Sequence, residues 1–254
     1  MVRSTRSKIR LMVFLAGTAA FSLAADSLEN WVDRFNADDE EIYTNAIPNS
    51  SAKAFLAANV PRFTCPDMEM ERAYYFRWWT YRKHIRETPD GYVVTEFLPP
   101  VGWAGKHNTI NCATGHHLME GRWLRDGRCV SWIDENQNPY SGDWISRSVI
   151  LLQRMRFPRE RGKDYNHSTF CDLVITGLAG LVPSDDGELV VDPLVPPEWR
   201  WFALTHVRYH RHDVSIYWDA DGTMYGKGPG LSVFVDGRLA ARANRVCRLS
   251  ASVQ

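Results

Sequence analysis

The chain has 254 residues, enough for one large domain or two modest ones with a buried core. Basic and acidic side chains both number 30, so the formal net charge is zero, which argues against a nucleic-acid-binding protein. Aromatic side chains are abundant, with 10 Trp, 10 Tyr and 11 Phe. Because Trp and Tyr combine flat apolar faces with a polar group, and sugar rings carry apolar C–H faces, this composition favours a carbohydrate ligand.

The first 25 residues are typical of a secretory signal peptide. Basic side chains at positions 3–10 precede an apolar run over 11–25, and the small residues around Ala24 fit a cleavage site. The apolar run is short for a membrane span. We therefore expect a mature protein that begins at Ala25 or Asp26, is secreted or lumenal, and contacts no membrane beyond the signal peptide.

Residues 26–183 carry mainly helical patterns. After short helical pieces and turns, Pro66 and Asp67 are typical of a helix start. The segment that follows, "MEMERAYYFRWWTYRKHIRE", has aromatic side chains on all sides, which predicts a helix that packs against several neighbours. A Pro-Asp-Gly turn with a short strand, the polar Gly-rich loop "VGWAGKHNTINCATGHH" and a helix beginning at "LMEGRWLRD" come next.

Two further segments complete this part of the chain. "WIDENQNPYSGDW", Trp132 to Trp144, places acids and amides beside a Gly turn between two tryptophans, a composition typical of a ligand-binding loop. The segment "TFCDLVITGLAGL" predicts an apolar helix that is capped by Ser168 or Thr169 and ended by Pro183. We expect Phe170, Leu173 and Leu178 to contact the C-terminal part.

Residues 184–254 change to a strand-like period. Six short runs, from "ELVVDPLV" through "TMYGKG" to "RLAARA", alternate apolar and polar residues and are separated by Asp-Gly turns. This pattern predicts an antiparallel, β-sandwich-like domain. His206, His210 and His212 share one strand parity, which a metal site would need, but ordinary strand positions account for them better. We expect no metal and no cofactor.

The cysteines, Cys65, Cys112, Cys129, Cys171 and Cys247, are odd in number, so at least one thiol is left without an intrachain partner. Their spacing matches no zinc motif. Cys171 lies in an apolar run and is expected to be a small buried side chain.

Long stretches of the sequence resemble secreted glycoside hydrolases of the mannosylglycerate-hydrolase-like group, relatives of trehalase and the family 63 glucosidases. The resemblance rests on "YYFRWWTYRKHI", "GWAGKHNTINCATGHHLMEGRWLRD", "WIDENQNPYSGDWI", "RGKDYNHSTFCDLVITGLAGLVP", "VDPLVP" and "VRYHRHDVSIYWDADGTMYGKGPGLSVFVDG". It covers nearly all of the chain after about residue 30. It implies an (α/α)₆ barrel of six helical hairpins with an attached β-domain, and inverting hydrolysis by an acid and a base carboxylate.

The resemblance also implies roles for individual residues. Glu135 matches the family's base in a stretch that continues through Pro139 and Gly142. Sugar-contacting positions carry over onto two loops and their flanks, and loop scaffolding is the alternative role for several of them. The expected substrate-binding residues are Trp103, Lys106, His107, Asn108, Arg122, Trp123, Asp126, Trp132, Asp134 and Trp144.

The sequence departs from that group between Asp126 and Trp132, where an early-barrel motif is followed almost directly by a late one. Twelve helices need roughly 250 residues with their loops, and residues 66–183 provide less than half of that. The region that should hold the general acid is absent, through a deletion, a truncated paralogue or a mis-spliced gene model.

These observations predict a mostly α fold with a β tail: a signal peptide over 1–25, part of a six-hairpin (α/α)₆ toroid over 26–183, and an antiparallel β-domain over 184–254. The expected function is that of a secreted glycoside hydrolase with little or no remaining activity. The alternatives are a non-catalytic carbohydrate-binding protein and a gene-model fragment. An incomplete toroid would leave the aromatic helix around Trp78 and Trp79 exposed, so self-association is also expected.

Overall fold

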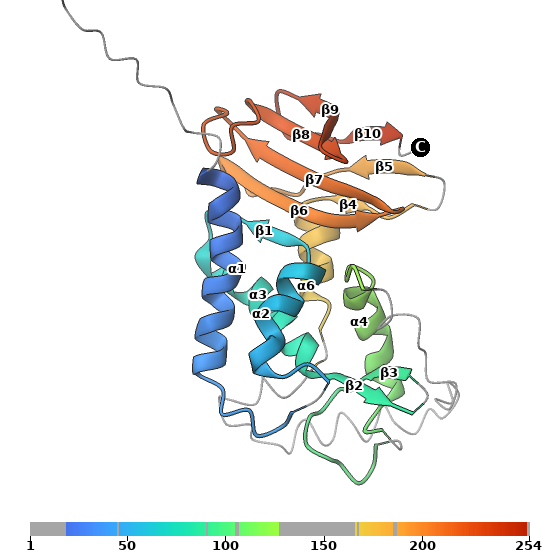
Figure 1. Cartoon of the computed structure of the whole chain (residues 1–254). Helices are drawn as coiled ribbons and strands as arrows, with labels where there is room; N and C mark the ends of the chain where they lie inside the picture. The colour runs from blue at the N-terminus through green and yellow to red at the C-terminus, as the bar shows by residue number, and fades with distance from the viewer. Residues whose placement is uncertain are drawn as a thin grey trace, which may run out of the picture.

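The computed structural model describes residues 19–44, 46–89, 91–104, 107–126, 166, 168–184 and 187–252, with side chains from Leu28 onward except those of Asn111 and Cys112. Figure 1 shows the strands of the second half gathered at one end of the molecule, with the helices below them. The helices are α1 (Ala19–Ala37), α2 (Asn49–Asn59), α3 (Met68–Lys83), α4 (Asn111–Gly121), α6 (Phe170–Leu173) and the π-helix η3 (Val174–Leu178).

All strand pairs in the described part are antiparallel, and they form three sheets. The largest has the order β1-β6-β7-β8-β9, the second has the order β10-β5-β4, and β2 and β3 form a separate hairpin. The strands are β1 (Arg62–Thr64), β2 (Ile85–Thr88), β3 (Gly91–Val94), β4 (Leu181–Val182), β5 (Glu188–Val191), β6 (Trp201–Tyr209), β7 (His212–Asp219), β8 (Gly230–Val235), β9 (Arg238–Ala243) and β10 (Leu249–Ser252).

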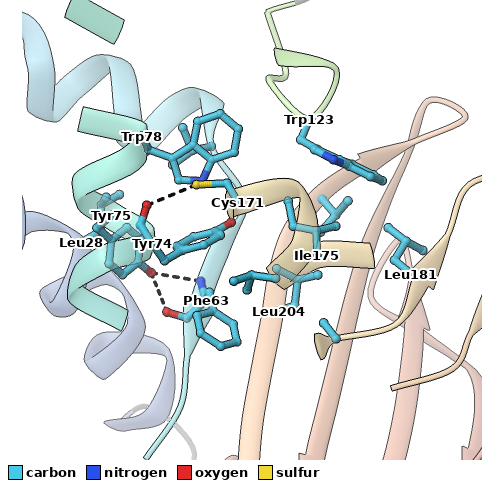
Figure 2. Close-up of a cluster of buried hydrophobic side chains, with 14 of the residues drawn as sticks. Leu28, Phe63, Tyr74, Tyr75, Trp78, Trp123, Cys171, Ile175, Leu181 and Leu204 are labelled. Carbon is cyan, nitrogen blue, oxygen red and sulfur yellow. Dashed lines mark hydrogen bonds between the residues drawn. The ribbon is translucent and has the colours of Figure 1, made fainter. Parts of the chain in front are cut away.

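One apolar core joins the helices to the two larger sheets. It contains Leu28 of α1, Trp78 of α3, Ile175 of η3 and Leu204 of β6, all with no exposed surface, together with inward-facing residues of β5, β7 and β8. Figure 2 shows how Tyr75 ties β1 into this core: its hydroxyl donates to the Phe63 carbonyl at 2.8 Å and accepts from the Phe63 amide at 3.0 Å. Helices and sheets therefore cover each other's apolar faces.

The predicted fold class, a mostly α chain with part of an (α/α)₆ six-hairpin toroid and a β tail, is wrong. The described part contains five α-helices and ten antiparallel strands in three sheets, an arrangement consistent with a β-sandwich domain. In a toroid, helices cover the apolar stripes of other helices. Here α1, α3 and η3 bury their apolar side chains in the same core as the two larger sheets, so no ring of hairpins is needed to complete the core.

The aromatic helix α3 begins where the sequence predicted. The Asp67 carboxylate caps it by accepting from the amides of Glu69 and Met70, both at 3.0 Å. Trp78 and Trp79 are at most 1% exposed, so the expectation that this helix would face solvent is wrong. Self-association stays a prediction, without that argument to support it.

The strand-like runs of the second half became β5 to β9, with one exception. The run "TMYGKG" forms no strand and lies in the connection between β7 and β8. Asp236 and Gly237 join β8 to β9 with φ values of 50° and 77°, as a two-residue hairpin turn of type I′ requires. The boundary between two domains at residue 183 stays a prediction.

The apolar helix before Pro183 is shorter than expected. Its first turn is α6, where the Ser168 hydroxyl accepts from the Phe170 amide at 3.1 Å, and η3 ends at Leu178 before β4 begins. Gly180, at φ 76°, makes the turn between them, so Pro183 is not what ends the helix. Leu173, expected at a buried interface, is 61% exposed.

Helix α1 runs without a break from Ala19 to Ala37 and so includes the expected signal-peptide cleavage site. The signal peptide stays a prediction. In the described part of the chain, no helix is long and apolar enough to cross a membrane.

Candidate functional site

The residues expected to form the site divide into two groups. Lys106, Trp132, Asp134, Glu135 and Trp144 lie outside the described residues. The other six lie in the loop between β3 and α4 and in the stretch that follows α4. Their roles in sugar binding stay predictions, but their contacts can be described.

Asn108 organises the loop between β3 and α4. Its Nδ2 donates to the carbonyls of Phe97 at 2.6 Å and Pro99 at 3.0 Å, and its Oδ1 accepts from the Val101 amide at 3.1 Å. The backbone has a φ of 63°, which Asn tolerates better than most residues, and the residue is 6% exposed. All of its side-chain polar atoms serve the loop, so Asn108 acts as a scaffold.

Two neighbours of Asn108 keep partial exposure. Trp103 packs edge-on against Phe97, with 5.3 Å between the ring centroids. The backbone carbonyl of His107 accepts a long hydrogen bond, of 3.4 Å, from Arg86 Nη1. The loop therefore holds an indole and an imidazole that are partly accessible, which is what a sugar-contacting position needs.

Arg122, Trp123 and Asp172 fasten the end of α4 to α6. One oxygen of Asp172 accepts from Arg122 Nη2 at 2.6 Å and from Trp123 Nε1 at 2.7 Å, and the guanidinium lies 5.0 Å from the centroid of the Trp123 ring. Trp123 is 3% exposed and belongs to the core (Figure 2), so its ring face is not open to a ligand. Asp126 donates its backbone amide to Asn59 Oδ1 at 3.0 Å.

A buried polar cluster lies between α3, α4 and the start of α6. We define it by Arg77, His84, His117, Glu120 and Asn166. Arg77 Nη2 donates to Asn166 Oδ1 at 2.8 Å and lies 3.5 Å from Glu120 Oε2. The other oxygen of Glu120 accepts from the backbone amide of Cys171 at 3.1 Å. The cluster thus joins segments that are 40 to 90 residues apart in the sequence.

Burial raises the pKa of the Glu120 carboxyl to about 7, although Arg77 and the Cys171 amide act in the opposite direction. A group with this pKa changes its protonation state around neutral pH, as a general acid or base must. Glu120 has no exposed surface, however, so it cannot touch a substrate from this position. Glu120 instead connects the helices around it, through Arg77 of α3 and the Cys171 amide of α6.

The hydrogen bonds of the two histidines fix their tautomers. His84 Nδ1 lies 2.8 Å from the Thr95 carbonyl and His117 Nε2 lies 2.6 Å from the Asn166 carbonyl; since a carbonyl only accepts, both nitrogens carry hydrogen. Burial, with His117 second, lowers the pKa of His84 well below its usual range. Among the described residues, four buried polar atoms of the cluster have no hydrogen-bond partner: Arg77 Nε, His84 Nε2, Glu120 Oε2 and Asn166 Nδ2.

A second buried carboxylate, Glu71, is also committed to the fold. It accepts from the Trp31 indole at 3.1 Å and from the Cys65 amide at 3.4 Å, and it is 4% exposed. Neither Glu71 nor Glu120 is therefore placed to act on a bound sugar. In the part of the chain that the structure describes, no group of three or more His, Cys, Asp or Glu side chains is arranged to hold a metal ion.

Sequence reasoning did not single out Arg77, and it considered Asp172 only as part of a helix cap. A signal for burial was present for both, because Arg77 lies in an aromatic helix and Asp172 in an apolar run. A charge that is carried into a core must be paired there. The expectation for Cys171 is confirmed, since it is a free cysteine with no exposed surface.

The three C-terminal histidines make different contacts. His206 Nε2 faces the Ala58 carbonyl at 3.3 Å, His210 Nε2 the Ser184 carbonyl at 2.6 Å, and His212 Nδ1 the Asp236 carboxylate at 2.7 Å. The shared strand parity is interrupted by a register shift between Leu204 and Val207.

Comparison with known proteins connects this fold to glycoside hydrolases. Residues 183–241 match the model of the glycosyl hydrolase family 65 C-terminal domain. The structure resembles a solved chain described as "Sialidase", with a TM-score of 0.77 and 20% sequence identity over 89% of this chain. This chain spans 44% of that solved chain, and at such identity the likeness concerns the fold alone. The match over residues 183–241 relates that part of the chain to the glycoside hydrolases.

Proposed function

We propose that this protein is a secreted relative of the glycoside hydrolases that binds carbohydrate and hydrolyses glycosides very weakly or not at all. The observation that carries the proposal is the match of residues 183–241 to a glycoside hydrolase C-terminal domain, because that range contains strands β5 to β8 and most of β9. The resemblance of nearly all of the chain after about residue 30 to the mannosylglycerate-hydrolase-like group supports it, with Glu135 in the position of the base.

The low expected activity follows from the general acid, whose region is missing according to the resemblance. Inverting hydrolysis needs an acid and a base roughly 6.5–9.5 Å apart, with room for a water between base and sugar. Glu71 and Glu120 are buried and bonded within the protein, so neither can serve as the acid for Glu135. Loss of a general acid costs about 10²–10⁴ in rate.

The first test measures hydrolysis and binding together. The purified chain is incubated with a panel of nitrophenyl glycosides and unmodified disaccharides, and binding of the same sugars is followed by tryptophan fluorescence and calorimetry. We expect binding without appreciable turnover. Rapid turnover would contradict the low activity, and the absence of both binding and turnover would favour a gene-model fragment.

The second test restores the segment that, according to the resemblance, is missing beside Asp126. Sequencing of the transcript across residues 126–131 shows whether a longer reading frame exists. A restored enzyme should turn over glycosides, and Glu135→Gln should abolish most of the turnover while sugar binding remains. Glu198→Gln, at an exposed position, is the matched control. A restored enzyme that is indifferent to Glu135→Gln would remove Glu135 from the role of base.

A further inference from the structure

His206 has an unusual backbone for a residue inside a strand. It lies in β6 at the register shift between Leu204 and Val207, and its φ is 61°. Non-glycine residues in this left-handed region are strained, and they persist where the surroundings hold them in place. A strand bulge of this kind re-aims a side chain, and here the imidazole leaves the sheet toward the helices.

The imidazole contacts two segments outside its own sheet. Its Nε2 lies 3.3 Å from the Ala58 carbonyl at the end of α2, and its Nδ1 lies 3.4 Å from Arg125 Nη1. The same Arg125 nitrogen donates to Asp213 Oδ2 on β7 at 2.6 Å and to the His206 carbonyl at 3.3 Å. Arg125 is therefore held from two neighbouring strands at once.

These contacts require the neutral form of His206. The Ala58 carbonyl only accepts, so Nε2 carries the hydrogen, and the lone pair of Nδ1 then faces Arg125 Nη1, which shares its two hydrogens among Asp213, the His206 carbonyl and this nitrogen. A proton added to Nδ1 removes that lone pair and sets two positive charges 3.4 Å apart. The new N–H would also compete with Arg125 for Asp213 Oδ2, which lies 3.9 Å from Nδ1.

The backbone next to Arg125 is tied to the same place. The Arg125 amide donates to the Asn59 carbonyl at 2.9 Å, and the Asp126 amide donates to Asn59 Oδ1 at 3.0 Å. Residues 125–126 are thus joined to α2 by hydrogen bonds from their backbone amides, and to the sheet by the arginine side chain. They directly precede the stretch of sequence that leads to Trp132.

We propose that His206, Arg125 and Asp213 form a pH-sensitive latch, which holds residues 125–126 on α2 and the sheet while His206 is neutral and releases them when it is protonated. The charged groups that face His206 are Arg125 after α4, Asp213 on β7 and Arg62 on β1. Burial first and Arg125 second lower the pKa of His206, and Asp213 acts against them without reversing the shift.

The sign of the pH dependence follows from that lowered pKa. The unfolded or released histidine, with an ordinary pKa of about 6.5, binds a proton more readily than the latched one. The latch is therefore at full strength above about pH 6.5 and weakens as the pH falls below it, by at most about tenfold per pH unit for one proton. The inference rests on these contacts alone and is independent of the proposed function.

Hydrogen exchange of the full chain tests the latch. After correction for the intrinsic exchange rate, the protection of the Arg125 and Asp126 amides should fall by up to about tenfold between pH 7.5 and pH 5.5. His206→Asn keeps a residue that tolerates a positive φ but does not titrate, and in this variant the fall should disappear. Unchanged protection in the wild type, or an equal fall in the variant, would refute the latch.

His210→Asn is the matched control. His210 also has a positive φ, of 46°, and also has Nε2 on a backbone carbonyl, but its ring lies against Tyr209. This variant should keep the wild-type pH response at residues 125–126. A titration of the labelled imidazoles by NMR in the wild type needs no variant: His206 should titrate below pH 6.5 as the Nε2–H tautomer, and a higher pKa would overturn the proposal.

Discussion

The sheets and the helical side of this molecule bury carboxylates in different ways. Asp219, at the end of β7 and 1% exposed, accepts from the backbone amides of Gly222, Met224 and Tyr225, at 2.9, 2.9 and 3.0 Å. Glu120, equally buried, has one backbone amide and an arginine at 3.5 Å. The sheet satisfies its carboxylate with three backbone amides from within the next six positions of the chain, whereas the helices depend on partners far away in the sequence.

This difference indicates where stability is vulnerable. A carboxylate held by its own loop keeps its partners whenever the loop forms. Glu120 keeps its partners only if α3, α4 and α6 are correctly placed. The same holds for Asn166, whose Oδ1 accepts a hydrogen bond from Arg77 of α3. Changes in the buried polar cluster should therefore affect folding more than changes at the sheet's turns.

The largest effect is expected for Arg77→Met. It leaves the Glu120 carboxylate buried without its cation, which typically costs about 3–5 kcal/mol in the free energy of unfolding. Urea denaturation should show a smaller loss at pH 5 than at pH 8, because Glu120 can then take up a proton. Arg72→Met is the control, since this arginine of the same helix is exposed and should change stability by less than about 0.5 kcal/mol. Equal losses of stability in both variants would show that the buried polar cluster is no more sensitive than an exposed position of the same helix.

Alanine substitutions at two glycines should give the next largest loss of stability. Gly180, between η3 and β4, has a φ of 76°, and an added Cβ would come within 2.2 Å of the backbone carbon of Asp192. Gly237, in the β8–β9 turn, has nearly the same φ of 77° with nothing within 4 Å. Gly237→Ala should lose about 1–2 kcal/mol for conformation alone, and Gly180→Ala roughly twice as much because backbone must also move.

Thermal and urea unfolding of the two glycine variants separate these contributions. If both variants lose the same stability, the close approach at Gly180 has no cost and the junction between helices and sheets is as tolerant as a free hairpin.

The last prediction is a pH dependence and concerns Glu120 itself. Its pKa of about 7 lies above the ordinary value of 4.5, so the folded state binds the proton more tightly and stability falls as the pH rises from about 4.5 to 7. Glu120→Gln removes this dependence. Between pH 5 and pH 8 the wild type should lose roughly 2–3 kcal/mol relative to the variant. Parallel pH profiles would show that Glu120 does not titrate in this range.

The local elements could be predicted from the sequence. The cap at Asp67, the buried aromatic helix around Trp78, the strands β5 to β9 and the Asp236–Gly237 turn all follow from short-range patterns. The exception, "TMYGKG", shows the limit of such patterns: its alternation suggests a strand, but the Asp219 carboxylate binds the amides of Met224 and Tyr225, which a strand would have used in its ladder.

The candidate site was predictable only in part. Asn108 and Trp123 were predicted to contact a sugar, but their side-chain polar atoms bind groups of the protein itself. The Asn108 amide binds carbonyls of its own loop, and the Trp123 indole binds the Asp172 carboxylate. The expected base, Glu135, lies outside the described residues. The role of Glu120 could not be read from its neighbours in the sequence, since its burial depends on α3 and α6.

By itself the sequence determined the elements whose cause is local: helix caps, apolar periodicity and turn residues act within a few positions of one another. Only the tertiary structure decided that β1 pairs with β6, with Phe63 opposite Leu204, and that Arg77 meets Glu120 and Asn166. It also decided that His206 turns to a positive φ and reaches Arg125. The physical reason is that these contacts join segments tens to more than a hundred residues apart, and they form because a shared core brings the segments together.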